Sequence, residues 1–506
     1  MRRNEMSRRQ RALLVRTLLF LFALNAASLA LYFLLYPSSR SPAAADSLRS
    51  LPTHAKDRPR SSLKPWPQIP SFLPWTPSPA PPIRSCEAYF GPGFSRRVDA
   101  IGSGGTDDGW FRCHYSETLR SSVCEGGRIR MDPARILMSE GGERLEAVIG
   151  RGEEDELPRY KSGAFQIESG EESGRRAMDD EFLEKYVPRG SVQFHTMRAL
   201  MESMQVVGHG QLGCTEWIEE PTVLVTRFEY ANVFHTVTDW YSAYVSSRVT
   251  GLSNRPNLVF VDGHCKTQLE ETWEALFSSV RYAKNFSSPV CFRHAVFAPL
   301  GYETALFKGL TEHISCQGTS ATDLRENPDD HKTARLSEFG ETLIAAFGLL
   351  EKRDLPRNPS AGYNVLFVRR EDYLAHPRHS GKVESRLSNE KEVFDAIYKW
   401  AASLGKCKIN IVNGLFAHMQ MKEQLQAIQD ADVVIGAHGA GLTHLVAAMP
   451  DTKVLEIISS MYRRPHFALI SEWKGLEYHA INLAGSSARP AEVIDELSHI
   501  MDSLGC

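Results

Sequence analysis

The segment DADVVIGAHGAGLTHLVAAMP, residues 430–450, decides the fold predicted for this chain. An apolar run at 432–436 is followed by glycines around a histidine, and a helical pattern then runs from Leu442 to Ala448. A strand, a glycine turn and a helix in this order are typical of a βαβ unit in a parallel sheet. Ligands of such sheets bind beyond the carboxyl ends of the strands, where this turn would lie.

The same alternation continues on both sides of the glycine segment. Short β-rich runs and helical periodicity alternate over 364–368, 390–404, 408–412, 419–429, 432–436, 442–448 and 453–458. This order predicts a parallel α/β domain over 346–480, followed by a closing helix within 481–506.

A second α/β domain is predicted over 86–345. Apolar runs at 221–226 and 257–262 flank a helical pattern at 233–249. The predicted fold class is therefore α/β, with two Rossmann-type domains that face a cleft. Within the first domain, residues 139–185 are acidic and Gly-rich, and we expect them to form an exposed insertion.

The first 85 residues do not resemble a globular domain. Residues 17–36 carry no charge, and about 20 such residues span a bilayer as a helix. Six arginines precede them, which predicts a cytoplasmic tail at 1–16 and a luminal remainder. A cleaved signal peptide, with Ala43–Ala45 as its cleavage site, is the alternative. Residues 37–85 are rich in Pro and Ser and predict an extended stem.

Composition limits the possible functions and the compartment. The chain has 506 residues and a formal net charge of -3, which gives no support for nucleic acid binding. All nine cysteines follow the stem and none forms a CxxC pair, so we expect several disulfides and at least one unpaired thiol. Asn285 begins the sequon Asn-Phe-Ser and is the predicted glycosylation site.

The glycine turn has the chemistry of a phosphate site. Gly439 and Gly441 have no side chains, so their N–H groups can approach a ligand closely. The helix that follows adds unpaired N–H groups and the positive end of a dipole. The alternative is that the glycines only permit a tight turn. The spacing matches neither GxGxxG nor a Walker loop, which disfavours a dinucleotide-dependent oxidoreductase.

Other residues near this turn could contact the same ligand. Arg369 and Arg370 end the run at 364–368, and arginine forks match phosphate oxygens. Glu456 lies in an otherwise apolar strand and needs a partner, either ribose hydroxyls or a core arginine. His438 is the better candidate ligand contact, whereas we interpret His444 as a packing residue.

A metal site is not predicted. Asp430 and Asp432 form a D-x-D sequence, but they precede their strand and so lie at the wrong end of the sheet for the ligand. No group of histidines and carboxylates has a convincing metal-ligand spacing in the sequence.

A second polar cluster lies at the start of the helix predicted at 233–249. His235 and Asp239 are four residues apart and so share a face. Either could take the proton of an attacking hydroxyl, with Asp239 as the first candidate and His235 as the second. Asn232, Trp240 and Tyr241 are candidate acceptor contacts. The alternative is a capped helix with core aromatics.

Taken together, the anchor, the stem, segment 232–239, Phe367–Arg370 and Gly436–His444 resemble glycosyltransferase family 61. The resemblance implies a GT-B architecture, an inverting mechanism and no obligatory metal or other cofactor. It implies UDP-xylose as donor, the core β-linked mannose of a protein N-glycan as acceptor, and a single-pass type II protein of the Golgi membrane. The residues themselves supply the candidate nucleotide-sugar contacts, which are Arg369, Arg370, His438, Gly439, Ala440, Gly441, Leu442 and Glu456.

Two alternatives stay open beside this resemblance. A relative within the family could transfer N-acetylglucosamine or another pentose to a protein or to a cell-wall polysaccharide. A non-catalytic luminal glycan-binding protein could keep the fold without turnover.

Overall fold

The C-terminal half of the chain folds into a parallel sheet. In the computed structural model the strand order is β16-β15-β17-β18-β19, and every neighbouring pair is parallel. The strands are β15 (Tyr363–Val368), β16 (Ile409–Gly414), β17 (Val433–Ala437), β18 (Lys453–Ile458) and β19 (Glu477–Asn482). The parallel sheet predicted from the glycine segment is confirmed, and β19 is a strand that the sequence did not reveal.

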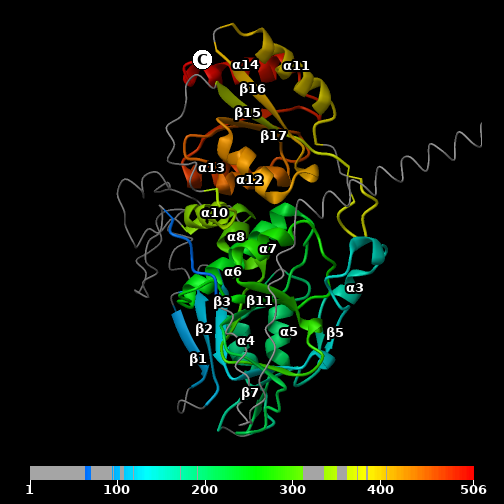
Figure 1. Cartoon of the computed structure of the whole chain (residues 1–506), viewed down its shortest axis with the longest axis vertical. Coiled ribbons are helices and arrows are strands. Elements are labelled where there is room, and N and C mark those ends of the chain that lie inside the picture. Colours follow the sequence, from blue (N-terminus) through cyan, green and yellow to red (C-terminus); the bar gives the residue numbers. More distant parts are fainter. Residues whose placement is uncertain are drawn as a thin grey trace, which may run out of the picture. The chain divides into compact units, whose positions relative to one another are not determined.

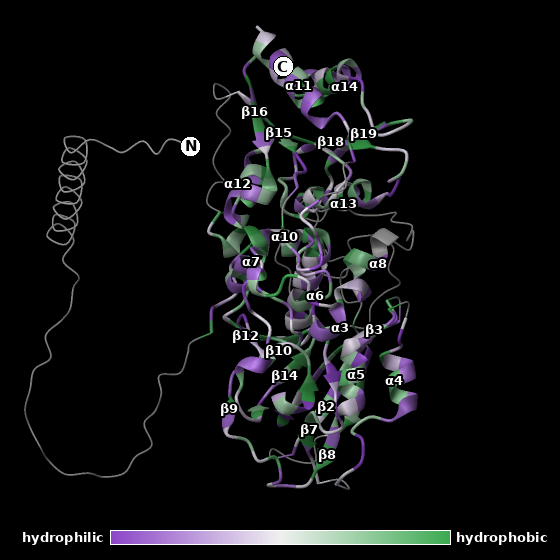
Figure 2. Ribbon diagram, turned by 90° about the vertical axis from the view of Figure 1, so that its right-hand side faces the viewer, coloured by the Kyte–Doolittle hydropathy of each residue, from purple (hydrophilic) through white to green (hydrophobic). Residues whose placement is uncertain are grey.

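Helices cover both faces of this sheet (Figure 1). On one face α11 (Glu390–Ser403) and α14 (Pro490–Ser503) pack against the strands through a shared apolar cluster. On the other lie α12 (Met421–Asp430), η9 (Ala440–Ala447) and α13 (His466–Lys474). The central strands are buried on both faces and have apolar sequences, and Figure 2 accordingly colours β15 and β18 mostly as hydrophobic.

The N-terminal half contains two larger sheets. The first has the order β1-β2-β3-β14-β10-β11-β12 and the second the order β8-β7-β4-β13-β9. In the first sheet β14, β10, β11 and β12 are parallel, whereas β1, β2, β3 and β14 pair antiparallel. Only the parallel part matches the Rossmann-type sheet predicted for 86–345.

The strand bounds of this half follow, with the short pair β5 and β6 included. They are β1 (Arg96–Ile101), β2 (Trp110–Ser116), β3 (Ser121–Gly127), β4 (Ile129–Met131), β5 (Ile136–Leu137), β6 (Arg159–Tyr160), β7 (Phe165–Glu168), β8 (Gln205–Val207), β9 (Glu216–Ile218), β10 (Thr222–Val225), β11 (Asn257–Phe260), β12 (Ser279–Tyr282), β13 (Val290–Phe292) and β14 (Ala295–Phe297).

The helices of this half include α6 (Val233–Val249), which begins and ends where the sequence predicts. The others are α3 (Glu153–Glu156), α4 (Asp180–Tyr186), α5 (Thr196–Ser203), α7 (Glu270–Leu276), α8 (Ala305–Thr311) and α10 (Arg335–Ala346). One apolar cluster runs through α6, α7 and α10 into α12, η9 and α13. The two halves therefore share a core.

The acidic segment 139–185 differs from its prediction as an exposed insertion. Its strand β7 lies between β8 and β4 in the second sheet, with Phe165 and Ile167 fully buried. The charges lie largely on the exposed residues of α3 and α4, so composition concealed a short strand that packs in the core.

The structure describes residues 63–69, 94, 96–102, 108–117, 119–170, 173–190, 192–311, 335–349, 362–372, 374–382, 386–405 and 407–506. The predicted tail and anchor at 1–36, the cleavage site and most of the stem lie outside the described residues. Within the described part, no helix has the length and apolar character that a membrane span requires.

Part of the predicted stem, residues 63–69, contacts the folded part through Lys64 and Trp66. Trp66 Nε1 donates to the carbonyl oxygen of Leu252 at 2.9 Å, and its ring meets that of Tyr244 edge-on at 5.8 Å. Lys64 Nζ donates to the carbonyl oxygens of Glu274 and Phe277 at 2.8 and 2.9 Å. The extended-spacer prediction is therefore wrong for residues 63–69.

Three disulfides join described cysteines, as the expectation of several disulfides requires. They link Cys113 to Cys124, Cys214 to Cys291 and Cys407 to Cys506. Cys265 is a buried free thiol. Cys86 and Cys316 lie outside the described residues.

Candidate functional site

The glycine turn lies at the carboxyl end of β17, the central strand of the C-terminal sheet. Leu442 N donates to the carbonyl oxygen of Gly439 at 3.0 Å, which closes the first turn of η9. The N–H groups of Ala440 and Gly441 precede that bond and so have no partner within the helix. The element is a 3-10 helix, tighter than the α-helix that the periodicity predicts.

Arg370 lies over this turn. A Cβ added to Gly439 would be 2.5 Å from Arg370 Nη1, so the guanidinium occupies the space where another residue would have a side chain. Arg369 points elsewhere, because its Nε donates to Glu390 Oε1 at 3.1 Å and its Nη1 to Asn413 Oδ1 at 3.3 Å. Of the two predicted arginines, the structure brings Arg370 to the turn.

Glu456 is wholly buried, and both of its oxygens have protein partners. Oε1 lies 2.5 Å from His438 Nδ1, and Oε2 accepts from the hydroxyl of Tyr478 at 2.6 Å. The carboxylate therefore orients the imidazole of His438, with its Nδ1–H donating to Glu456. The partner is neither a core arginine nor an open ribose site, so contact with a ribose would require these bonds to break.

His466, which the sequence analysis missed, extends the site. It begins α13, its ring centroid lies 5.9 Å from that of His438, and it stacks on Phe234 of α6 at 5.2 Å. Burial, together with the nearby charges of His438, Arg464 and other cationic groups, lowers the pKa of His466 to about 4. The signal that would have found it is the run Arg463-Arg464-Pro465-His466, which follows β18 at the same edge of the sheet.

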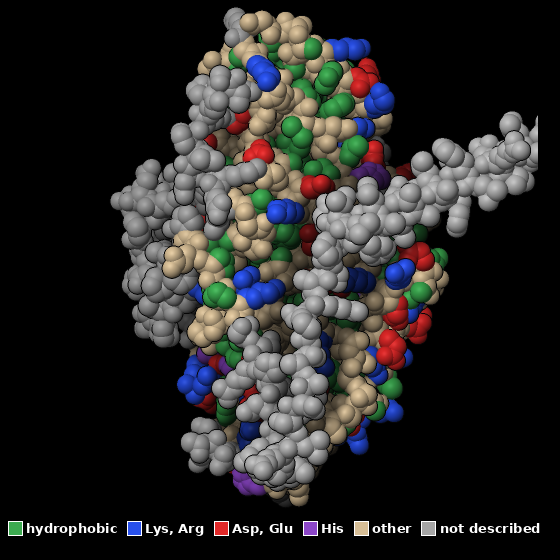
Figure 3. Space-filling model, in the orientation of Figure 1, with side chains coloured by type: hydrophobic (Ala, Val, Ile, Leu, Met, Phe, Trp, Pro, Cys, Tyr) green, Lys and Arg blue, Asp and Glu red, His purple; other side chains and the backbone are tan. Residues whose placement is uncertain are grey.

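These groups suit an anion. Helix N–H groups, the guanidinium of Arg370 and the histidines come from the ends of β15, β17 and β18, which are neighbours in the sheet. Elsewhere Lys, Arg, Asp and Glu side chains are interspersed over the face seen in Figure 3. A phosphate or diphosphate at the turn would meet the helix N–H groups and the guanidinium of Arg370.

His235 and Asp239 lie on α6 but differ in environment. Asp239 is 5% exposed, its carboxylate accepts from the backbone N–H of Gly301, and burial raises its pKa well above the ordinary value. Burial lowers the pKa of His235, so its ring is neutral near pH 7. Its Nδ1 is buried without a hydrogen-bond partner among the described residues. The two side chains share a helix face, but the structure shows no bond between them.

The candidate acceptor contacts on α6 have structural roles. Asn232 caps the helix, with Oδ1 accepting from Phe234 N at 3.1 Å. Trp240 and Tyr241 are 1% and 2% exposed and belong to the apolar cluster shared by the two halves. Neither ring is open to a sugar, so the alternative of core aromatics describes them.

His444 is also a packing residue, as interpreted from its place in the helix. Its Nδ1–H donates to the carbonyl oxygen of Gly441 at 2.9 Å, and its ring packs on Phe416 at a centroid distance of 4.8 Å. Burial lowers its pKa to about 4. The His444 ring therefore stabilises the glycine turn through its bond to Gly441 and its packing on Phe416.

The D-x-D sequence behaves as expected from its position. Asp432 Oδ2 accepts from Asn364 N at 2.7 Å at the start of the sheet, away from the turn. Among the described residues, no group of three or more His, Cys, Asp or Glu side chains is arranged to hold a metal ion. Asn285 is exposed, and its Oδ1 accepts from Tyr282 N at 2.9 Å, which leaves the amide nitrogen open.

Comparison of the sequence with known proteins identifies its relatives. The family profile described as Glycosyltransferase 61 matches residues 181–455, which include α6 and the glycine turn. The chain is 64% identical to Beta-1,2-xylosyltransferase RCN11 of Oryza sativa subsp. japonica, over 98% of this chain and 96% of that protein. It is 56% identical to the Beta-1,2-xylosyltransferase of Arabidopsis thaliana, over 97% of this chain and 99% of that protein.

A more distant similarity covers about half of the chain. An EGF domain-specific O-linked N-acetylglucosamine transferase of Gallus gallus is 23% identical over 52% of this chain and 45% of that protein. The profile match covers more than half of the residues, and the two plant relatives align over nearly the whole length. The chain belongs to the glycosyltransferase 61 family.

Proposed function

We propose that this chain is an inverting β-1,2-xylosyltransferase that transfers xylose from UDP-xylose to the core β-mannose of N-glycans. The observation that carries the proposal is the identity of 64% and 56% to two proteins of that name, over nearly their whole length. The donor nucleotide and the glycan follow from this class of enzyme. The geometry of the turn supports the donor half of the reaction.

The glycine turn would hold the diphosphate of the donor. Arg370 and the N–H groups of Ala440 and Gly441 would neutralise the charge that develops on UDP as the glycosidic bond breaks. His466 would donate a hydrogen bond to the same oxygens. His438, whose Nδ1–H donates to Glu456, would accept a hydrogen bond from a sugar hydroxyl through Nε2. Arg369 would act indirectly, since its pair with Glu390 fixes the chain where it leaves β15.

The base is proposed to be one of the pair on α6. Inversion needs one group that takes the proton of the mannose hydroxyl as its oxygen attacks the anomeric carbon. Asp239 remains a candidate, but in this conformation an acceptor cannot reach its buried carboxylate. His235 is neutral, less buried, and connected to His466 through Phe234. We favour His235 as the base, with Asp239 holding the backbone of Gly301 against α6.

The two halves would form a GT-B-like enzyme, with the donor bound by the C-terminal sheet and the acceptor beside α6. The packing of α6 against η9 and α13 supports this, because it brings the candidate base to the glycine turn at residues 439–442, the proposed donor turn. The uncharged run at 17–36, with arginines before it, supports a type II anchor and a luminal catalytic part in the Golgi.

The test is a donor panel. The chain without residues 1–61 is incubated with UDP-xylose, UDP-N-acetylglucosamine and other UDP-sugars, together with a biantennary N-glycan, with and without EDTA. The expected result is a mass gain of one pentose from UDP-xylose only, unaffected by EDTA. A hexosamine gain would instead assign it the donor named for the chicken relative, and release of no UDP would leave a glycan-binding protein.

A further inference from the structure

The acidic segment ends in a carboxylate that is buried while its neighbours are exposed. In the short helix α3, Glu153, Glu154 and Asp155 face solvent, but Glu156 is 0% exposed. Burial of a charged carboxylate is costly unless partners compensate it. The partners of Glu156 therefore indicate why this segment is folded onto the protein.

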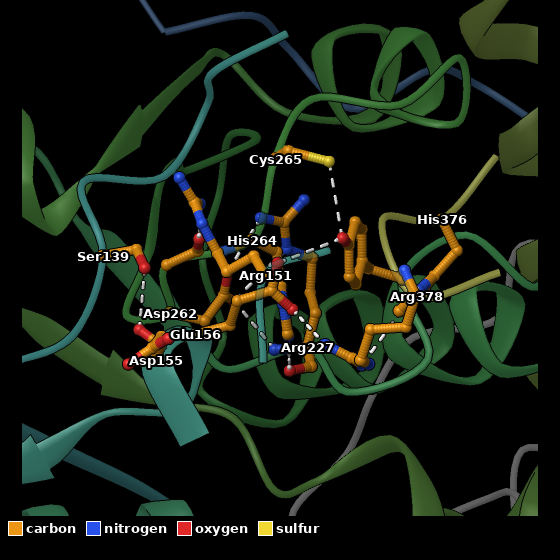
Figure 4. Close-up of polar contacts among 12 residues, drawn as sticks. Ser139, Arg151, Asp155, Glu156, Arg227, Asp262, His264, Cys265, His376 and Arg378 are labelled. Carbon is orange, nitrogen blue, oxygen red and sulfur yellow. Dashed lines mark hydrogen bonds and ion pairs between the residues drawn. The ribbon is translucent and has the colours of Figure 1, made fainter. Parts of the chain in front are cut away.

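Glu156 meets side chains from both halves of the chain (Figure 4). Its Oε2 accepts from Arg378 Nη1 at 2.6 Å and lies 3.2 Å from His264 Nδ1, and its Oε1 accepts from the hydroxyl of Tyr230 at 3.4 Å. Burial alone would raise the pKa of Glu156, but His264 and Arg378 more than reverse this, so its pKa is lowered. His264 and Tyr230 follow β11 and β10, whereas Arg378 comes from the C-terminal half.

The acidic segment is docked on the N-terminal sheet by its backbone. Gly263 N donates to the carbonyl oxygen of Glu156 at 2.7 Å, and Arg151 Nη1 donates to that of Gly263 at 3.2 Å. Arg227 and Asp262, joined by a bond of 2.7 Å, lie beneath these contacts. Glu156 is therefore a fixed point at the carboxyl ends of β10 and β11.

Arg378 belongs to the connection between β15 and α11. This connection begins with Arg369 and Arg370, and Arg370 lies over the glycine turn. Further along, Pro377 accepts a backbone bond from Gly150 N at 2.9 Å, and the ring of His376 lies 5.1 Å from that of Tyr230. One stretch of chain thus runs from the donor turn to the fixed carboxylate.

His376 holds Arg378 in its direction. Arg378 approaches both ring nitrogens of His376, with its backbone N 3.2 Å from Nδ1 and its Nη2 3.0 Å from Nε2, and a neutral ring accepts from one of them. Burial, together with the charge of Arg378, lowers the pKa of His376 to about 4, so the ring is neutral and can accept. The guanidinium is therefore held between an imidazole on its own loop and a carboxylate on the other half.

We propose that Glu156 and Arg378 are positioning residues of the transfer reaction, whose contact fixes the connection that carries Arg370 over the donor turn. The inference rests on the proposed function, because it assigns the two residues to donor binding. It gives the acidic segment a role: it supplies the carboxylate against which the donor-side loop is held. Neither residue needs to touch the substrate.

The test compares Glu156→Gln, Arg378→Met and their combination with the wild type. Glu156→Gln removes the charge of the pair and Arg378→Met removes its donor, so we expect each to raise the KM for UDP-xylose and the dissociation constant of UDP at least tenfold. The KM for the glycan should change less than twofold. Because the residues act as a pair, the double variant should bind UDP no less tightly than the single variant with the lower UDP affinity. Arg378→Lys should restore part of the donor affinity.

Glu154→Gln is the matched control, since it removes an exposed carboxylate from the same helix, and it should behave as the wild type. Thermal unfolding of each variant separates loss of fold from loss of donor binding. Unchanged UDP affinity in a folded Glu156→Gln or Arg378→Met variant would overturn the inference, and so would independent, multiplying losses in the double variant. If the wild type transfers no xylose, the proposed function fails, whereas UDP titration of the same variants still decides this inference.

Discussion

Replacing Gly439 with alanine adds one carbon atom at the donor turn and tests whether Arg370 binds the nucleotide there. The added Cβ would lie 2.5 Å from Arg370 Nη1, too close to persist, so the guanidinium must move. The backbone at Gly439 has a φ of 176°, an extended conformation that alanine also adopts. The substitution therefore displaces one cationic group from the turn without straining the chain.

The size of the effect follows from the group displaced. A hydrogen bond to a charged group contributes about 1.5–3 kcal/mol. At about 1.4 kcal/mol per factor of ten, its loss weakens binding roughly 10- to 150-fold. We expect Gly439→Ala to raise the dissociation constant of UDP by this factor, measured by calorimetric titration. The kcat/KM for UDP-xylose should fall at least as much, measured from initial rates of transfer to an N-glycan.

Gly485→Ala is the matched control, because an added Cβ at Gly485 meets no atom within 4 Å. It should bind UDP as the wild type does. Arg370→Ala should reproduce the loss, and the double variant with Gly439→Ala should lose nothing more. If Gly439→Ala binds UDP normally, or if the double variant is tenfold weaker than Arg370→Ala, then Arg370 does not act on the nucleotide at this turn.

Three further predictions concern the base, the stem and the pH dependence. His235→Ala should lower kcat at least 100-fold, the usual scale for loss of a general base, with UDP affinity unchanged in titration; a kcat close to that of the wild type would exclude it as the base. Trp66→Ala should lower the free energy of unfolding by about 2 kcal/mol in urea titration, since it removes a half-buried ring and one hydrogen bond, whereas Gln68→Ala, at an exposed site of the same segment, should not. The folded-state pKa of His444 is about 4 against 6.5 for the unfolded chain, so the unfolded chain binds the extra proton below pH 6.5. Its contribution to stability should therefore fall by roughly 2 kcal/mol between pH 7.5 and 5, a loss that urea titrations should not find in His444→Gln.

The C-terminal sheet could be predicted from sequence because its central strands are buried on both faces. Val433–Ala437 and Lys453–Ile458 are apolar runs of strand length, each followed by a helix or a turn, and few folds other than a parallel α/β sheet produce that pattern. The second N-terminal sheet gave no such signal. Its strands have three or four residues and lie within charged sequence, as Phe165–Glu168 does in the acidic segment. Pairings between segments far apart in sequence leave no local periodicity.

The candidate site was predictable where backbone chemistry decides it and not where side-chain packing does. The turn at Gly439 and Gly441 follows from strand, glycine and helix order alone. Trp240 and Tyr241 have the residue types of a sugar platform, but the helix that carries them is buried between the two halves. Whether an aromatic side chain on α6 faces solvent depends on α10 and α13, which are distant in the sequence.

The donor turn and the helix of the candidate base are held as one packed unit. Gly340 of α10 approaches η9 so closely that a Cβ there would lie 2.0 Å from the carbonyl oxygen of Val446. The apolar cluster continues from α6 through η9 into α13. Wide separation of the halves would expose this core to water, at about 25 cal/mol for each Å² of apolar surface. Adjustment to the donor is therefore expected in the connection between β15 and α11, which crosses between the halves through polar contacts. The position of Arg370 over the donor turn is therefore expected to depend on the contact between Glu156 and Arg378 rather than on a hinge between the halves.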